Sequence, residues 1–165
     1  TQSRSSAASD VYKRQALNSV RTFGGVIEHP CGSYAWKHFE IAVPPRSGGW
    51  IKADAFGGFT CCVEQGRYGH YARKPTFIYA FASELPELRW GKSNAVFPQW
   101  AIDKYGIAKC RRAGELAFKG GGTNSHARIS TPNEFRDILL SIARSVEIVP
   151  EDLIEFEAGQ REDCK

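Results

Sequence analysis

A carboxylate, an imidazole and a thiol stand close together in the sequence, at Glu28, His29 and Cys31. They stand at the end of an apolar run that is terminated by Pro30. This arrangement is typical of a strand that leads to the rim of an active site. A thiol becomes a nucleophile when a nearby cation favours its thiolate, and alternate residues of a strand point the same way. Cys31 is therefore a candidate catalytic residue with His29 as its partner; an inert cysteine in a turn is the alternative.

Glu28 offers a different chemistry. A carboxylate that closes a buried strand is costly unless it is hydrogen-bonded or paired. In this place it can accept the amino group or ring N–H of a base, or share a proton with a ring nitrogen. Glu28 is therefore a second candidate catalytic residue, and a structural ion pair with an arginine or lysine is the alternative.

A loop between two predicted strands, residues 59–65 and 76–82, interleaves cations with aromatic rings. This mixture suits contact with phosphates together with stacking on bases, whereas a solvated hairpin tip is the alternative. The candidate nucleic-acid-binding residues are Arg67, Tyr68, His70, Arg73, Lys74 and Thr76.

Three predicted elements position these groups. Residues 24–30 read as a buried strand, and residues 59–65 and 76–82 read as an antiparallel hairpin with a long connecting loop. Residues 131–146 predict an amphipathic helix, with Thr131 as N-cap, Pro132 at the first helical position and Glu134 completing a capping box. The apolar stripe of this helix is Phe135, Ile138, Leu139, Ile142 and Val146.

The composition is that of one globular domain. The chain has 165 residues, of which 42% are hydrophobic and 24% charged, and it has no run long enough to span a membrane. The formal charge is +4, with acids concentrated after residue 150, so the basic body fits contact with nucleic acid or an ordinary mixed surface. The five cysteines show neither a disulfide framework nor zinc-site spacing, which predicts no metal and a cytoplasmic location.

The first residues have a composition of their own. Residues 1–15 show no apolar period, and residues 10–15 spell DVYKRQ, which resembles the translated transposon end of a sequencing adaptor. We expect residues 1–15 to be a non-native tail, residues 16–150 a partial domain and residues 151–165 an acidic flexible tail. On this interpretation the natural gene was interrupted before residue 16.

Three motifs occur in a recognisable order: EHPCGSYAW at residues 28–36, QGRYGHYARKPT at residues 65–76 and LPEL at residues 85–88. Together they resemble phage and bacterial proteins related to the cytosine-5 DNA methyltransferases. In that family a glutamate ends the fifth strand of a Rossmann-like sheet and holds the target cytosine, a role that the resemblance implies for Glu28. A later loop between antiparallel strands positions that glutamate and the DNA, and Arg73 and Lys74 are its implied equivalents.

The resemblance also implies what the parent protein would need. S-adenosylmethionine is the implied cofactor and DNA the implied partner, but the glycine-rich cofactor motif and the Pro-Pro-Cys-Gln nucleophile are not found in this chain. Pro30 and Cys31 could themselves be the Pro-Cys motif, which is the alternative.

The expected fold is thus α/β: the end of a parallel Rossmann-like sheet, an antiparallel hairpin and a C-terminal amphipathic helix. The expected function is to contribute base and DNA contacts as the C-terminal fragment of a methyltransferase-like protein that is inactive alone. The alternatives are a non-catalytic nucleic-acid-binding module and an enzyme that uses Cys31 and His29. An exposed sheet edge would also favour self-association.

Overall fold

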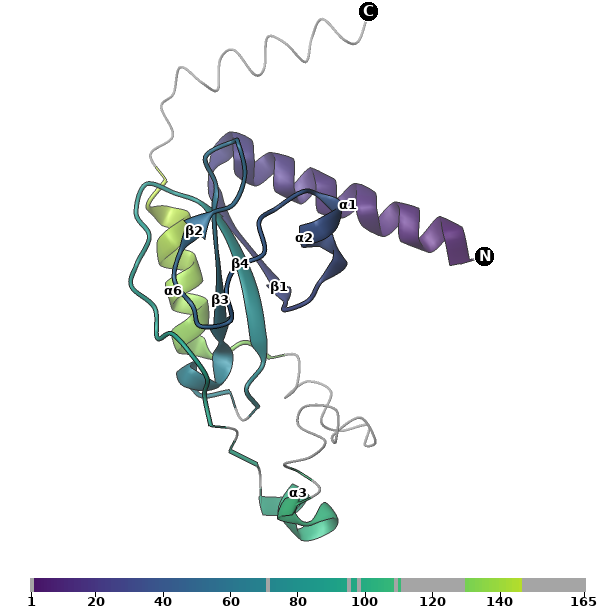
Figure 1. The fold of residues 1–165 in the computed structure, drawn as a ribbon, viewed down its shortest axis with the longest axis vertical. Coiled ribbons are helices and arrows are strands. Elements are labelled where there is room, and N and C mark those ends of the chain that lie inside the picture. The colour runs from purple at the N-terminus through teal and green to yellow at the C-terminus, as the bar shows by residue number, and fades with distance from the viewer. Residues whose placement is uncertain are drawn as a thin grey trace, which may run out of the picture.

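The computed structural model describes residues 2–70, 72–94, 96–97, 99–108, 110 and 130–146, with side chains from residue 10 onward. In these residues a four-stranded sheet lies between helices, with α6 on one side and α1 and α2 on the other (Figure 1). This confirms the expected mixed α/β fold. Among the described helices, none has the length and apolar character that crossing a membrane requires.

The sheet is antiparallel throughout its described strands. Its strands are β1 (Gly25–Pro30), β2 (Ile51–Lys52), β3 (Phe59–Glu64) and β4 (Pro75–Phe81). Their order is β1-β4-β3-β2, and each neighbouring pair runs antiparallel. The predicted hairpin is therefore confirmed as β3 and β4, whereas no described pair forms the expected parallel sheet.

Alternation along the strands divides the apolar side chains between two clusters. On the face toward α1 and α2 (Tyr34–His38), Ile27, Phe77 and Tyr79 pack together. On the face toward α6, Val26 and Ile78 pack with that helix. Because successive side chains of a strand point to opposite faces, Glu28 belongs to the α6 face and His29 to the α1 face.

Helix α1 spans Gln2–Phe23 and includes most of the segment that the sequence sets apart. Nothing between these bounds interrupts it, because the segment contains neither glycine nor proline. Leu17 anchors it in the core with 3% of its surface exposed, and Gly24 ends it at a φ of +74°. Residues 2–15 are therefore helical, while the adaptor origin of that segment stays a prediction.

Helix α6 spans Asn133–Arg144 and confirms the predicted amphipathic helix. Phe135 and Ile142 are buried at 0% and 1% exposure. The predicted cap is wrong: the N-cap is Pro132 and makes no side-chain hydrogen bond, and Glu134 pairs with Arg89 instead of closing a capping box. The predicted acidic tail, residues 151–165, lies outside the described residues.

Three short helices complete the described elements: α2, the 3₁₀ helix η1 (Gln65–Tyr68) and α3 (Gln99–Tyr105). The Ser33 hydroxyl caps α2 by accepting the Ala35 amide at 3.3 Å. Trp36 of α2 lies on this face of the sheet and donates its indole N–H to Thr60 Oγ1 of β3 at 3.0 Å. This bond fixes the segment after β1 over the α1 face.

Candidate functional site

Glu28 is held by a glutamine from the β3–β4 loop. Gln65 follows β3 directly, is fully buried and donates its Nε2 to Glu28 Oε1 at 3.0 Å. The same nitrogen donates to Thr76 Oγ1 at 3.0 Å. The half-buried carboxylate of edge strand β1 is thereby tied to both ends of the hairpin loop.

The pattern of donors and acceptors sets the orientation of the Gln65 amide. The two groups that face this amide, the Glu28 carboxylate and the Thr76 hydroxyl, both act as acceptors, because the hydroxyl donates its own proton to the Lys74 carbonyl at 3.1 Å. The amide must therefore turn its NH₂ group toward them. A flipped amide would turn its oxygen toward the Glu28 carboxylate. In the described residues Gln65 Oε1 has no hydrogen-bond partner, so the site holds an amide oxygen beside a carboxylate. Because Gln65 is fully buried, this oxygen is not open to a ligand, and the half-buried Glu28 carboxylate is the acceptor that can meet N–H groups.

An ion pair between a buried carboxylate and an exposed arginine closes the base of the loop. Arg73 forks onto Glu64, with Nε lying 3.1 Å from Oε1 and 2.9 Å from Oε2. The Ser93 backbone N–H and hydroxyl donate to Glu64 Oε2 at 2.7 and 2.9 Å. Burial alone would raise the pKa of Glu64, but the bonds from Arg73 and Ser93 outweigh it and lower the pKa to about 2. Glu64 is therefore an anion that fastens the loop to residues 89–94.

The predicted nucleic-acid-binding residues divide by burial. Tyr68, His70 and Thr76 are buried, at 4%, 6% and 0% exposure, so their side chains do not present a surface to DNA. The Tyr68 ring packs on Phe135 of α6 at 5.2 Å between centroids. The aromatic ring expected to stack on a base is thus part of the core.

The three predicted cations of the loop make structural contacts. Arg67 donates to the Gly91 and Lys92 carbonyls at 3.2 and 2.9 Å. Arg73 pairs with Glu64, and Lys74 donates to the Ser130 carbonyl at 2.7 Å. No hydrogen bond joins Arg73 or Lys74 to Glu28 in the described residues. The contacts therefore do not support the role in positioning Glu28 that the resemblance implies for these two residues.

Gln65 is the residue that sequence reasoning did not single out. It opens the motif QGRYGHYARKPT, so its position was visible, but nothing in its type distinguishes a buried glutamine from a solvated one. The signal that could have found it is its place directly after an alternating strand, on the same face as Cys61 and Val63.

Cys31 and His29 lie away from Glu28, on the α1 face. Cys31 packs against the cluster that contains Cys62, and after burial the Cys31 thiol is the next cause that raises the pKa of Cys62. His29 lies 5.9 Å from Trp36 between ring centroids, and no hydrogen bond joins it to Cys31 in the described residues. Burial lowers the pKa of His29 and the Lys13 ammonium lowers it further, against the opposing effect of Glu28. A cysteine–histidine pair is therefore not assembled.

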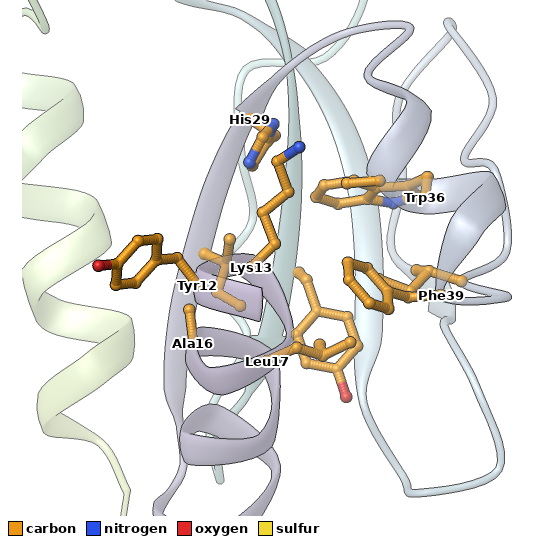
Figure 2. A pocket seen from close by; sticks show the side chains of 11 residues that line it. Tyr12, Lys13, Ala16, Leu17, His29, Trp36 and Phe39 are labelled. Carbon is orange, nitrogen blue, oxygen red and sulfur yellow. The ribbon is translucent and has the colours of Figure 1, made fainter. Parts of the chain in front are cut away.

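A pocket of about 220 Å³ lies beside His29, between α1, β1 and α2 (Figure 2). Its walls are aliphatic and aromatic, and Lys13 and His29 stand together at one end. Its internal polar groups are engaged, because Trp36 donates to Thr60 and the Tyr79 hydroxyl donates to Asp54 at 3.0 Å. The pocket lies across the sheet from the Glu28 carboxylate.

This pocket does not fit S-adenosylmethionine. That cofactor carries a sulfonium and an ammonium cation and two ribose hydroxyls, which require carboxylates or free carbonyls. No carboxylate stands among the residues that line the pocket, and the Lys13 ammonium at one end would repel the cations. Within the described residues, no group of three His, Cys, Asp or Glu side chains could hold a metal ion.

Comparisons of the chain with protein-family models, with curated proteins and with solved structures found no match. The site therefore rests on its own geometry: Glu28 at an edge strand, Gln65 and Thr76 holding it, and the Glu64–Arg73 pair holding the loop.

Proposed function

We propose that this chain carries the base-holding part of a cytosine-5 DNA methyltransferase-like protein of phage or bacterial origin, with Glu28 as the group that binds the target cytosine. The observation that carries the proposal is the hydrogen bond from Gln65 to Glu28. The family resemblance implies a glutamate at a strand end, positioned by a later loop between antiparallel strands. The β3–β4 loop reaches Glu28 in that way, through Gln65.

The chemistry of the pair fits a cytosine edge. Cytosine offers its exocyclic amino group as a donor, and its ring nitrogen can share a proton with a carboxylic acid. The two oxygens of the half-buried Glu28 carboxylate are acceptors, and Gln65 holds one of them in place. Thymine has a carbonyl in place of that amino group, so the same acceptors would repel it.

Transfer of a methyl group is not proposed for this chain alone. The pocket beside His29 does not fit the cofactor, and Cys31 lies on the α1 face, away from the α6 face that carries Glu28. Of the described thiols, Cys61 shares the α6 face with Glu28, but it is fully buried and burial raises its pKa, so it is not an accessible nucleophile for a base held there. The Rossmann-like parent, its cofactor and its DNA target belong to the proposal as a whole.

A binding measurement tests the role of Glu28. The chain is titrated with two single-stranded oligonucleotides that differ by one cytosine-to-thymine change, so that the target base is already unpaired. We expect tighter binding to the cytosine strand and a loss of about tenfold in that affinity for Glu28→Ala, the effect of one good base contact. Glu84→Ala removes an exposed carboxylate elsewhere and should bind like the unaltered chain.

Two results would overturn the proposal. One is equal binding of both oligonucleotides by the unaltered chain, which would leave only phosphate contact. The other is an equal loss on both strands for Glu28→Ala, which would indicate a structural role. Transfer of a labelled methyl group to DNA by the purified chain would separately refute its expected inactivity.

A further inference from the structure

The outer edge of β1 presents unpaired backbone groups. The Cys31 N–H donates to the Pro75 carbonyl at 2.9 Å, which identifies that pair as a hydrogen-bonded rung of the β1–β4 ladder. In an antiparallel ladder such rungs alternate with unbonded pairs. Ile27 and His29 therefore bond to β4, whereas Val26 and Glu28 turn their N–H and C=O groups away from it. None of the described strands pairs with this outer side of β1.

Among the described elements, helices cover both faces of β1 and no strand pairs with its outer edge. Helix α1 packs on one face and α6 on the other, yet none of the six strand residues is buried. The neighbouring strand β4 has five consecutive buried residues under the same layers. The exposure of β1 therefore comes from its edge, where the half-buried side chains of Val26 and Ile27 flank the unpaired backbone. Such an edge is a template for another strand.

The two ends of β1 limit the length of any added strand. Gly24 and Gly25 have φ values of +74° and +127°, outside the strand region, and Pro30 has no N–H to offer. The two glycines and Pro30 therefore exclude a long pairing that could shift in register. The outward N–H and C=O groups of Val26 and Glu28 remain available for an added strand. A short edge of this kind favours one defined register.

We propose that β1 pairs with β1 of a second copy of this chain, antiparallel, with Val26 of each copy opposite Glu28 of the other. This register places the two Ile27 side chains at the two-fold axis, in an unbonded pair where side chains lie closest. It also sets His29 opposite Gly25, which has no side chain to oppose it. The register shifted by one rung would face Glu28 with Glu28, and like charges directly opposite are destabilising.

The pairing does not depend on a role for Glu28 in base binding. Backbone groups of Val26 and Glu28 make the rungs, and the Glu28 side chain keeps its contact with Gln65 on the α6 face. Two copies of a four-stranded sheet would form one continuous sheet through an isologous contact. The inference concerns this chain as it stands, since a Rossmann-like parent would place a further strand at the same edge, and its test does not measure base binding, so the two outcomes are distinguishable.

Amide exchange of the full chain, measured across a range of protein concentrations with sedimentation of the same samples, tests the pairing. We expect the Val26 and Glu28 amides to become protected as the dimer forms, and the Ile27 and His29 amides to be protected at every concentration. A monomer at all concentrations would overturn the proposal. So would a monomer in which Val26 and Glu28 are already protected, because the same chain would then cover the edge.

Two variants sharpen the test. Val26→Pro removes an outward N–H without removing a bond to β4, so the dimer should be lost while the circular dichroism of the monomer is kept. Leu140→Ala, at an exposed apolar position of α6, should leave the dimer intact. In a Cys31→Ser, Cys164→Ser background, Ile27→Cys should form a covalent dimer on mild oxidation and His29→Cys should not. Equal cross-linking by both, or by neither, would overturn the register.

Discussion

Gln65 Nε2 lies 3.0 Å from Glu28 Oε1, although 37 residues separate the two in sequence. The bond links an edge strand to a loop that the hairpin presents on the α6 face. Because Gln65 is fully buried, its position is set by the fold, and the position of the carboxylate follows from it. The candidate site is therefore arranged from within the core.

Replacing Gln65 by leucine should destabilise the chain by about 1–3 kcal/mol, because Thr76 loses its buried donor and Glu28 loses its partner. Chemical denaturation measures the change. In a double-mutant cycle with Glu28→Ala, the two losses should add to more than the loss in the double variant, which is the sign of a direct contact. Strict additivity would mean that the Gln65–Glu28 bond contributes nothing to stability.

Stability should fall in acid through Glu64. Its folded pKa, about 2, is below the ordinary value of 4.5, so the carboxylate stabilises the fold fully above pH 4.5. This contribution is lost as the pH falls from 4.5 toward 2, because in this range the unfolded chain binds the proton while the folded chain still resists it. With Arg73 43% exposed, we expect a loss on the order of 2 kcal/mol, measured by denaturation at successive pH values.

Two variants separate Glu64 from the other carboxylates. Glu64→Gln should flatten the stability profile in this acid range, since the group that titrates is gone. Ser93→Ala removes one donor and should move the loss of stability to higher pH. An unchanged profile in Glu64→Gln would assign the acid sensitivity to other groups.

The strands and the last helix were predictable because their periods are local. The alternation of residues 59–63, the β-branched and aromatic run of residues 76–82 and the stripe of residues 135–146 need no knowledge of the rest of the chain. The antiparallel order of the sheet was only half visible: β3 and β4 were predicted as a hairpin despite the long loop between them, but nothing local places β4 next to β1. Long-range pairing is decided by which faces bury together.

The candidate site was predictable only in part. Glu28 was visible as a carboxylate at a strand end, whereas its partner Gln65 depends on where β3 passes into η1. Tyr68 looked like a stacking platform among cations, but Phe135, much later in the sequence, covers its ring. Residue types indicate what a loop could bind, and packing decides which of its side chains remain accessible.

Gly24 should be intolerant of any side chain. A Cβ at this position would lie 2.3 Å from Val146 Cγ1, and the φ of +74° is unfavourable for other residues. Gly32 is a matched control, with a φ of +82° and nothing within 4 Å of its Cβ position. Gly32→Ala should cost roughly 1–2 kcal/mol from backbone strain alone. Gly24→Ala should cost a further 1–3 kcal/mol for the clash.

Denaturation of the two alanine variants measures this difference, and Val146→Ala in the Gly24→Ala background should recover part of it. The comparison tests whether the end of α6 packs against the turn between α1 and β1. Equal losses at Gly24 and Gly32 would contradict that packing.

The cysteines should differ sharply in reactivity. Burial raises the pKa of Cys62 to about 11, with Cys31 contributing, and burial also raises the pKa of Cys61. At pH 8 both are therefore protonated and shielded, and iodoacetamide should modify half-exposed Cys31 before the other described cysteines, as peptide mass spectrometry would show. Fast alkylation of Cys31 relative to Cys61 is thus expected from burial alone and does not identify a nucleophile.

The discriminating comparison is between Cys31 and a small free thiol. No hydrogen bond joins His29 to Cys31 in the part of the chain that the structure describes, so Cys31 should react no faster than glutathione, and His29→Gln should leave its rate unchanged. His29→Asn is a second control that keeps a polar side chain beside Trp36. A Cys31 rate well above that of glutathione, lost in both variants, would restore the cysteine–histidine enzyme as the better interpretation.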